Sequence, residues 1–159
     1  MTAGAEQARY SVQLLISDWL LVDGTMDNHV QSAIDGAVPD GEGDAAGWEE
    51  GSAGDVGAEV EDVALPAVAQ LGSSIRQAGW DQISGWPHDV AGFVTWPAPG
   101  QMATVTLSGA QWDLVVLALR HWADVDERLS DAAGAAKSRA VATALGRQLA
   151  ARGWSPRLR

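Results

Sequence analysis

The sequence predicts an α+β fold, in which a small antiparallel sheet packs against helices and the chain ends in an αα-hairpin. Apolar residues alternate with polar residues near the N-terminus and again over 102–107, which is the period of a half-buried strand. From 109 to 152 they recur instead at the spacing of an amphipathic helix. With 159 residues, of which 47% are hydrophobic, the chain is long enough to bury a core.

One domain is therefore expected over residues 1–159, in four consecutive parts. They are a strand hairpin (10–35), an acidic glycine-rich loop (36–62), a segment with a helix, a Trp- and Pro-rich stretch and a strand (63–108), and a helical hairpin (109–154). The loop is predicted from composition, because a segment so rich in glycine and acidic residues cannot bury enough apolar surface to offset the entropy lost on ordering.

The first part is expected to be a β-hairpin. Alternating apolar residues predict a strand over 10–22, although its end around Trp19 would also suit a helix. Asp23 and Gly24 form a common turn sequence, so residues 26–34 would supply the returning strand.

The third part is expected to hold one helix and one strand. Pro66 suits the first turn of a helix that runs to Ala78, and Gly79 suits the left-handed position that often follows a helix. Prolines interrupt the stretch that comes next, where residues 92–96 would form at most a short strand. Clean alternation then predicts a strand over 102–107.

The C-terminal third predicts two helices. Ser108 followed by Gln111 is a capping-box pattern, and a wide apolar stripe predicts a helix over 109–128. A second helix is expected over 132–152, because Gly153 is the residue type that helix C-termini favour.

Charge is distributed unevenly along the chain, whose formal net charge is -11. Residues 10–75 hold thirteen acidic residues and no Lys or Arg, whereas residues 101–159 hold eight basic residues. Because affinity for phosphate backbones and anionic membranes comes from Lys and Arg, we expect no direct binding to nucleic acid or to a membrane. The basic half could also dock on the acidic half within the same chain.

The chain has no cysteine, which excludes disulfides, thiolate metal sites and a cysteine nucleophile. No apolar run approaches the ~20 residues that span a bilayer, and no basic stretch leads into an apolar run as in an export signal. We therefore expect a cytoplasmic protein. Its nine Arg against one Lys, with abundant Ala and Gly, are typical of high-GC genomes such as those of actinobacteria and their phages.

Catalytic and metal-binding patterns are sparse. His88 precedes Asp89, and His121 lies three residues before Asp124, but neither pair is joined by a second ligand pair of the kind that metal sites use. The chain contains no phosphate loop, dinucleotide fingerprint or nucleophile elbow. We expect no cofactor and no enzymatic activity; a small hydrolase built around His88 or His121 is the third hypothesis.

Tryptophan is abundant, with eight residues in the chain. Four border apolar segments and are expected in the core: Trp19, Trp112, Trp122 and Trp154. Three crowd the proline-interrupted stretch: Trp80, Trp86 and Trp96. Side chains there either cover the core or offer an amphipathic anchor to a partner.

The leading hypothesis is a non-enzymatic interaction or regulatory protein that binds a cationic protein partner. The candidate binding residues are Asp35, Asp40, Glu42, Asp44, Glu49, Glu50, Asp55, Glu59, Glu61, Asp62, Trp80, Trp86 and Trp96. The alternative is a nucleic-acid mimic that inhibits a DNA- or RNA-handling enzyme, as anti-restriction and anti-CRISPR proteins do. Mimicry requires carboxylates at phosphate-like spacing on ordered backbone, whereas the glycine content favours a mobile segment.

Overall fold

The structure, a computed structural model, describes residues 8–37 and 65–157. In chain order the elements are β1 (Arg9–Leu15), α2 (Ile16–Ala37), α3 (Ala67–Gln82), the short 3-10 helix η1 (Ala91–Val94), β2 (Met102–Ser108), α4 (Gly109–Arg128) and α5 (Ala132–Ala150). A two-stranded antiparallel sheet packs against four helices, and the last two form a hairpin. The predicted α+β class is thus confirmed.

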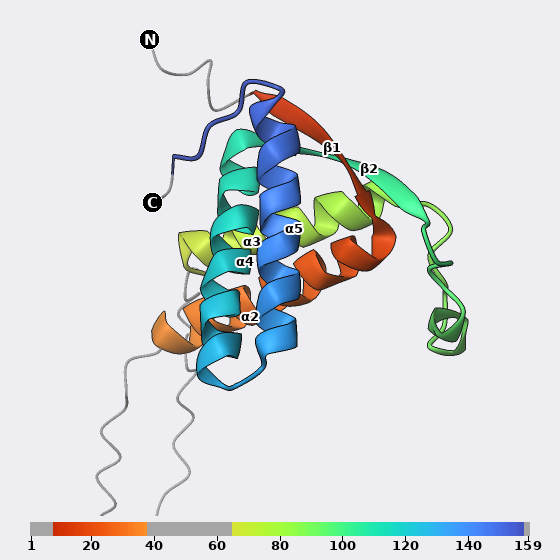
Figure 1. Cartoon of the computed structure of the whole chain (residues 1–159), viewed down its shortest axis with the longest axis horizontal. Coiled ribbons are helices and arrows are strands. Elements are labelled where there is room, and N and C mark those ends of the chain that lie inside the picture. The colour runs from red at the N-terminus through yellow and green to blue at the C-terminus, as the bar shows by residue number, and fades with distance from the viewer. Residues whose placement is uncertain (1–7, 38–64, 158–159) are drawn as a thin grey trace, which may run out of the picture.

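The two strands form a ribbon that runs across one end of the α4–α5 hairpin and on to the ends of α2 and α3 (Figure 1). Its register pairs Arg9 with Ser108 at one end and Leu15 with Met102 at the other. Every second side chain faces the helices, as the pleat of a strand requires. Four of these side chains are buried: Val12, Leu14, Val105 and Leu107.

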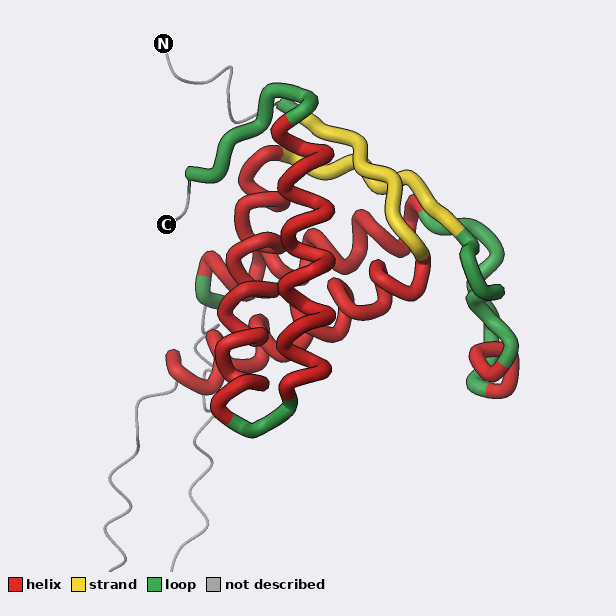
Figure 2. Tube along the Cα trace, viewed as in Figure 1, coloured by secondary structure: helices red, strands yellow, loops and turns green. Residues whose placement is uncertain are grey.

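The helices form two antiparallel pairs, and α2 with α3 crosses behind α4 with α5 (Figure 2). The core lies between the pairs and under the ribbon. Its largest fully buried side chains include Trp19, Trp112, Met26, Ile75, Leu119 and Leu145. Trp154 is also buried and Trp122 packs against the same cluster, so the core role expected for four tryptophans is confirmed. Among the described helices, none has both the length and the apolar content needed to cross a bilayer.

Local sequence signals define the C-terminal hairpin. The Ser108 hydroxyl accepts from the Gln111 backbone N–H at 3.2 Å, and the Gln111 side-chain oxygen accepts from the Ser108 N–H at 2.9 Å. This reciprocal pair is the predicted capping box. Helix α5 ends at Ala150, slightly before the expected end, and Gly153 follows with a φ of 83°. Glycine reaches that left-handed conformation without steric cost, which explains its place after the helix.

The predicted β-hairpin over 10–35 is wrong beyond residue 15, within its expected first strand over 10–22. Strand β1 ends at Leu15, and residues 16–37 form α2, with the supposed turn at Asp23 and Gly24 inside the helix. The buried side chains of α2 recur every three or four residues: Ile16, Trp19, Val22, Thr25 and Met26. Helical burial of that face prevails over the short alternating pattern that continues from β1.

The helix predicted to run from Pro66 to Ala78 does not stop before Gly79, because α3 continues through it to Gln82. A Cβ atom at position 79 would lie 1.8 Å from Cζ2 of Trp19 on α2. Gly79 therefore serves helix packing, because its missing side chain makes room for the Trp19 indole between α2 and α3.

The short strand expected over 92–96 is also wrong. Residues 91–94 form η1, and the Trp96–Pro97 peptide that follows is cis. The Asp89 carboxylate accepts from the Gly92 N–H at 2.8 Å, which favours a turn at this point over an extended strand. The predicted acidic loop over 36–62 begins with the last two residues of α2, and its residues 38–62 lie outside the described part of the chain.

Candidate partner-binding surface

The structure brings together the three predicted tryptophans but not the predicted carboxylates. Trp80 lies in the last turn of α3, while Trp86 and Trp96 lie on the segment 83–101 that connects α3 to β2 and projects from the end of the ribbon (Figure 2). We call this segment the aromatic arm. Asp35 lies near the C-terminal end of α2, away from the arm, where it accepts from Gln31. The other nine predicted carboxylates fall outside the described residues: Asp40, Glu42, Asp44, Glu49, Glu50, Asp55, Glu59, Glu61 and Asp62.

The rings of the arm form a connected cluster. The Trp80 ring centroid lies 5.7 Å from that of Trp86 and 6.3 Å from that of Trp96. Phe93 meets Trp96 edge to face at 5.6 Å, and His88 lies 6.1 Å from Trp86. These separations are within the range in which aromatic pairs attract each other. The cluster therefore gives the arm an ordered aromatic core although the segment has little regular secondary structure.

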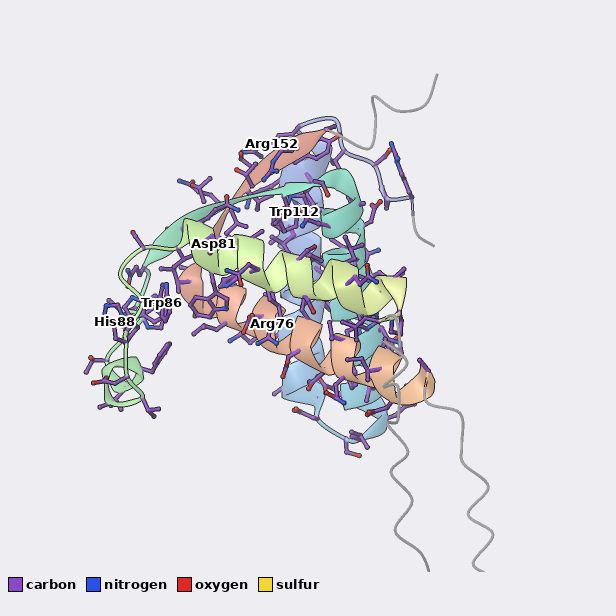
Figure 3. The ribbon with its side chains drawn as sticks, turned by 180° about the vertical axis from the view of Figure 1, so that it is seen from behind. Arg76, Asp81, Trp86, His88, Trp112 and Arg152 are labelled. Atoms are coloured by element: carbon purple, nitrogen blue, oxygen red, sulfur yellow. The ribbon has the colours of Figure 1, made fainter. Side chains whose placement is uncertain are left out.

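The outer side of the arm is apolar and faces solvent. Val90 and Val94 are 88% and 85% exposed, Met102 at the start of β2 is 50% exposed, and Trp86 and Phe93 are 43% and 41% exposed. In the described residues, five of the eight exposed large hydrophobic side chains thus lie between residues 86 and 102. Figure 3 shows Trp86 and His88 together on the arm, beside the end of α3. Contiguous exposed apolar patches are typical of interaction surfaces, whereas single exposed apolar residues are ordinary.

Trp80 anchors the base of the arm to α2. Its indole N–H donates to an Asp23 carboxylate oxygen at 3.0 Å, and the Arg76 guanidinium donates to the same oxygen at 2.8 Å. Arg76 also pairs with Asp27. The hydrogen bond that Arg76 donates to the Asp23 carboxylate is the main reason that the pKa of Arg76 is raised. Two carboxylates of the acidic half are thus neutralised by an arginine of α3 and not by the C-terminal hairpin.

The remaining charge near the arm is negative. Residues 77–119 contain no Lys or Arg, while Asp81 and Asp89 are exposed at the base and on the loop of the arm. In the C-terminal hairpin, Arg139 pairs with Asp124 and Glu127 on α4, so this arginine is engaged within the hairpin. Residues 8–37 and 65–157 together hold eleven acidic and nine basic residues, so most of the net charge of the chain lies outside them.

The histidines do not pair with the acidic neighbours expected from the sequence. Asp89 accepts from the Gly92 N–H and Asp124 from Arg139. The His121 ring instead lies 5.9 Å from His29 on α2. Burial and, to a lesser extent, the charge of His121 hold the pKa of His29 below its ordinary value. In the described ranges, no three His, Asp or Glu side chains are arranged to hold a metal ion.

Sequence analysis missed the aliphatic part of this surface. Val90, Val94 and Met102 lie near the aromatic residues in the sequence and are exposed, but isolated valines and methionines carry no signal of exposure. Their position in a segment interrupted by prolines was the available clue, since such a segment has no period along which to bury them.

The chain matches no protein-family model, and neither a curated protein nor a solved structure matches it.

Proposed function

We propose that this chain is a non-enzymatic, cytoplasmic interaction protein that binds a cationic protein partner through its aromatic arm. The observation that carries the proposal is the exposure of four large apolar side chains, Trp86, Val90, Phe93 and Val94, on one short projecting segment. Burying a large apolar side chain contributes about 1.5–3 kcal/mol of favourable free energy. In the isolated chain these side chains are exposed, so much of this contribution is not yet made. A partner that covers the arm would gain it.

The ring cluster makes the arm suited to binding. Trp86 contacts both Trp80 and His88, and Trp80 is held in place by its hydrogen bond to Asp23. The exposed Trp86 indole therefore packs against side chains that are already ordered. A side chain that is already ordered loses less conformational entropy when a partner covers it. Tryptophans in such settings supply much of the binding free energy at protein interfaces.

The charge around the arm favours a basic partner. Asp81 and Asp89 are exposed, and Arg76, the nearest cation along the chain, is engaged by Asp23 and Asp27. A basic surface approaching the arm would therefore meet carboxylates without a competing cation from residues 77–119. Opposite charge of this kind raises the association rate and selects the partner.

Affinity capture from cells of the native host, with the full chain immobilised, tests the proposal. The captured partner is purified, and its affinity is compared for the unmodified chain, Trp86→Ala and Leu129→Ala. We expect Trp86→Ala to weaken binding about 30-fold, as loss of an interface hot spot does. Leu129 is 74% exposed near the α4–α5 connection and serves as the matched control, so its replacement should leave the affinity unchanged.

Salt dependence separates the two parts of the proposal. Raising the salt from 0.1 to ~0.5 M shortens electrostatic screening lengths and should weaken the binding of a cationic partner. A partner that binds Trp86→Ala and the unmodified chain equally well would exclude the arm. A partner whose affinity is independent of salt would exclude the cationic character.

A further inference from the structure

We propose that the partner binds as an extended basic segment that adds a strand to the open edge of β2 beside Thr104. This inference rests on the proposed function and specifies how the partner docks. The ribbon has two outer edges, one on β1 and one on β2, and the register shows which residues of each strand direct their backbone groups outward.

Each edge of the ribbon is closed at one residue by a glutamine. On β2, the Gln82 side-chain oxygen accepts from the Thr106 N–H at 2.7 Å, and the Gln82 amide nitrogen donates to the Thr106 carbonyl at 2.9 Å. On β1, the Gln148 side chain makes the same two bonds with Gln13, at 3.1 and 2.7 Å. Each amide thus replaces one residue of a missing neighbouring strand.

The edge of β2 continues past the glutamine. Backbone groups of alternate residues face the same side of an antiparallel strand, so the N–H and C=O of Thr104 face outward as those of Thr106 do. Thr104 itself is exposed. Within the described residues, no hydrogen bond from outside the ribbon reaches the backbone of Thr104. An exposed strand edge of this kind is a template for pairing with another chain.

A cleft lies beside this part of the edge. It has a volume of about 300 Å³ and is lined by residues 82–84 on the connection that leaves α3, by residues 101–104 of β2 and its approach, and by Ile16. The cleft therefore lies between the edge of β2 and the base of the arm. A segment added in this cleft would pair with Thr104. Met102, 50% exposed on the same strand, would contact its side chains, and the arm lies directly beyond.

Charge decides the composition of the added segment. Asp81 is exposed immediately before Gln82, and Asp89 is exposed on the arm, with no Lys or Arg in residues 77–119. Arg9 of β1 reaches the same edge, but its guanidinium is engaged there by the Thr106 carbonyl at 3.2 Å. The expected occupant is therefore a partner segment in which Lys or Arg alternates with apolar residues. Its backbone would contribute affinity at Thr104, and its side chains would contribute specificity through the carboxylates and the arm.

A peptide selected on the intact protein supplies the probe. A displayed library of random ten-residue peptides is selected on the full chain, and the affinity of the strongest peptide is measured for a series in which one backbone nitrogen at a time is methylated. A strand directs alternate N–H groups to its two sides. We expect basic residues to be enriched, and methylation to weaken binding more than about tenfold at every second position while leaving the positions between nearly unaffected.

Two variants locate the peptide. Thr104→Pro removes the outward N–H at an edge position, where proline is tolerated, and should abolish binding. Gln82→Ala frees the N–H of Thr106, while Arg9 still donates to its C=O, and should strengthen binding about fivefold, because the open edge gains a donor. Because Gln82→Ala leaves the strand backbone intact, it tests the proposal even if Thr104→Pro fails to fold. Protection of the Thr104 amide from hydrogen exchange by the peptide is the direct readout.

The outcomes distinguish this inference from the function on which it rests. Binding that depends on Trp86 but shows no alternation on methylation and no protection of Thr104 overturns strand addition and leaves the arm as the binding surface. Alternation and protection that persist unchanged in Trp86→Ala support strand addition and exclude the arm. Failure of the library to yield any basic peptide overturns the strand proposal.

Discussion

The indole N–H of Trp80 donates to the Asp23 carboxylate, and this contact joins the base of the aromatic arm to α2 across 57 residues of sequence. The same carboxylate receives Arg76. One aspartate therefore orders the ring that supports Trp86 and removes the cation nearest to the arm along the chain. The apolar surface and its negative surroundings depend on this one side chain.

Replacing Asp23 with asparagine should destabilise the protein. The variant keeps the shape of the side chain but loses the charge that receives Arg76, and Asp23 is only 15% exposed. We expect a loss of about 1–2 kcal/mol in the free energy of unfolding, measured by urea titration. Asp35→Asn on the same helix is the control, because Asp35 accepts only from Gln31 among the described residues and its replacement should cost less than about 0.5 kcal/mol. Equal effects of the two variants would contradict the anchoring role of Asp23.

Gly79→Ala should destabilise the protein by about 2 kcal/mol or more, although alanine is the better helix former. The added Cβ would lie 1.8 Å from the Trp19 ring in the buried contact between α2 and α3, so the core would have to shift. Gly146→Ala is the matched control on α5. No atom outside its own turn of helix lies within 4 Å of a Cβ at that position, so this variant should gain up to about 1 kcal/mol. Thermal unfolding of both variants measures the difference, and a stable Gly79→Ala would show that Trp19 does not fill that space.

Stability should decrease as the pH falls below the ordinary pKa of His29, which is 6.5. Burial, with a smaller contribution from the charge of His121, lowers the pKa of His29 in the folded protein, so the folded state disfavours the protonated ring. The unfolded chain takes up this proton first. The free energy of unfolding therefore falls from pH 6.5 down to the folded-state pKa and is not reduced further by this group below it.

Urea titrations at about pH 7.5 and 5.5 isolate this contribution, because other groups are shared by the variants. His29→Gln should lose less stability between the two conditions than the unmodified protein. His88→Gln changes an exposed ring on the arm and should behave as the unmodified protein does. If His29→Gln shows the same loss as His88→Gln, burial of His29 does not control the pH dependence.

Local signals in the sequence were sufficient for the C-terminal half of the fold. The capping box at Ser108 and the apolar stripe of α4 are properties of neighbouring residues, so they are readable without knowledge of the rest of the chain. Residues 16–35 were mispredicted because Asp23-Gly24 is a strong local turn sequence. The packing of Trp19 against Gly79 opposes that preference, and this contact joins segments far apart in the sequence.

The candidate site was predictable in part. The crowding of Trp80, Trp86 and Trp96 in a proline-interrupted stretch was visible in the sequence, but their meeting in one cluster depends on how α3 leads into the arm. The anchor at Asp23 could not be foreseen, because its partners Arg76 and Trp80 come from another helix. Nine of the thirteen acidic residues between 10 and 75 lie in residues 38–62, which are outside the described ranges.

Site-specific photo-crosslinking in cells of the native host tests most directly whether the arm is the partner-binding surface. A photoreactive phenylalanine replaces Val94, which is 85% exposed on the arm, or Leu129, which is 74% exposed near the α4–α5 connection. The account predicts one crosslinked protein of basic composition from position 94 and none from position 129. The same adducts from both positions, or no adduct from position 94, would contradict it.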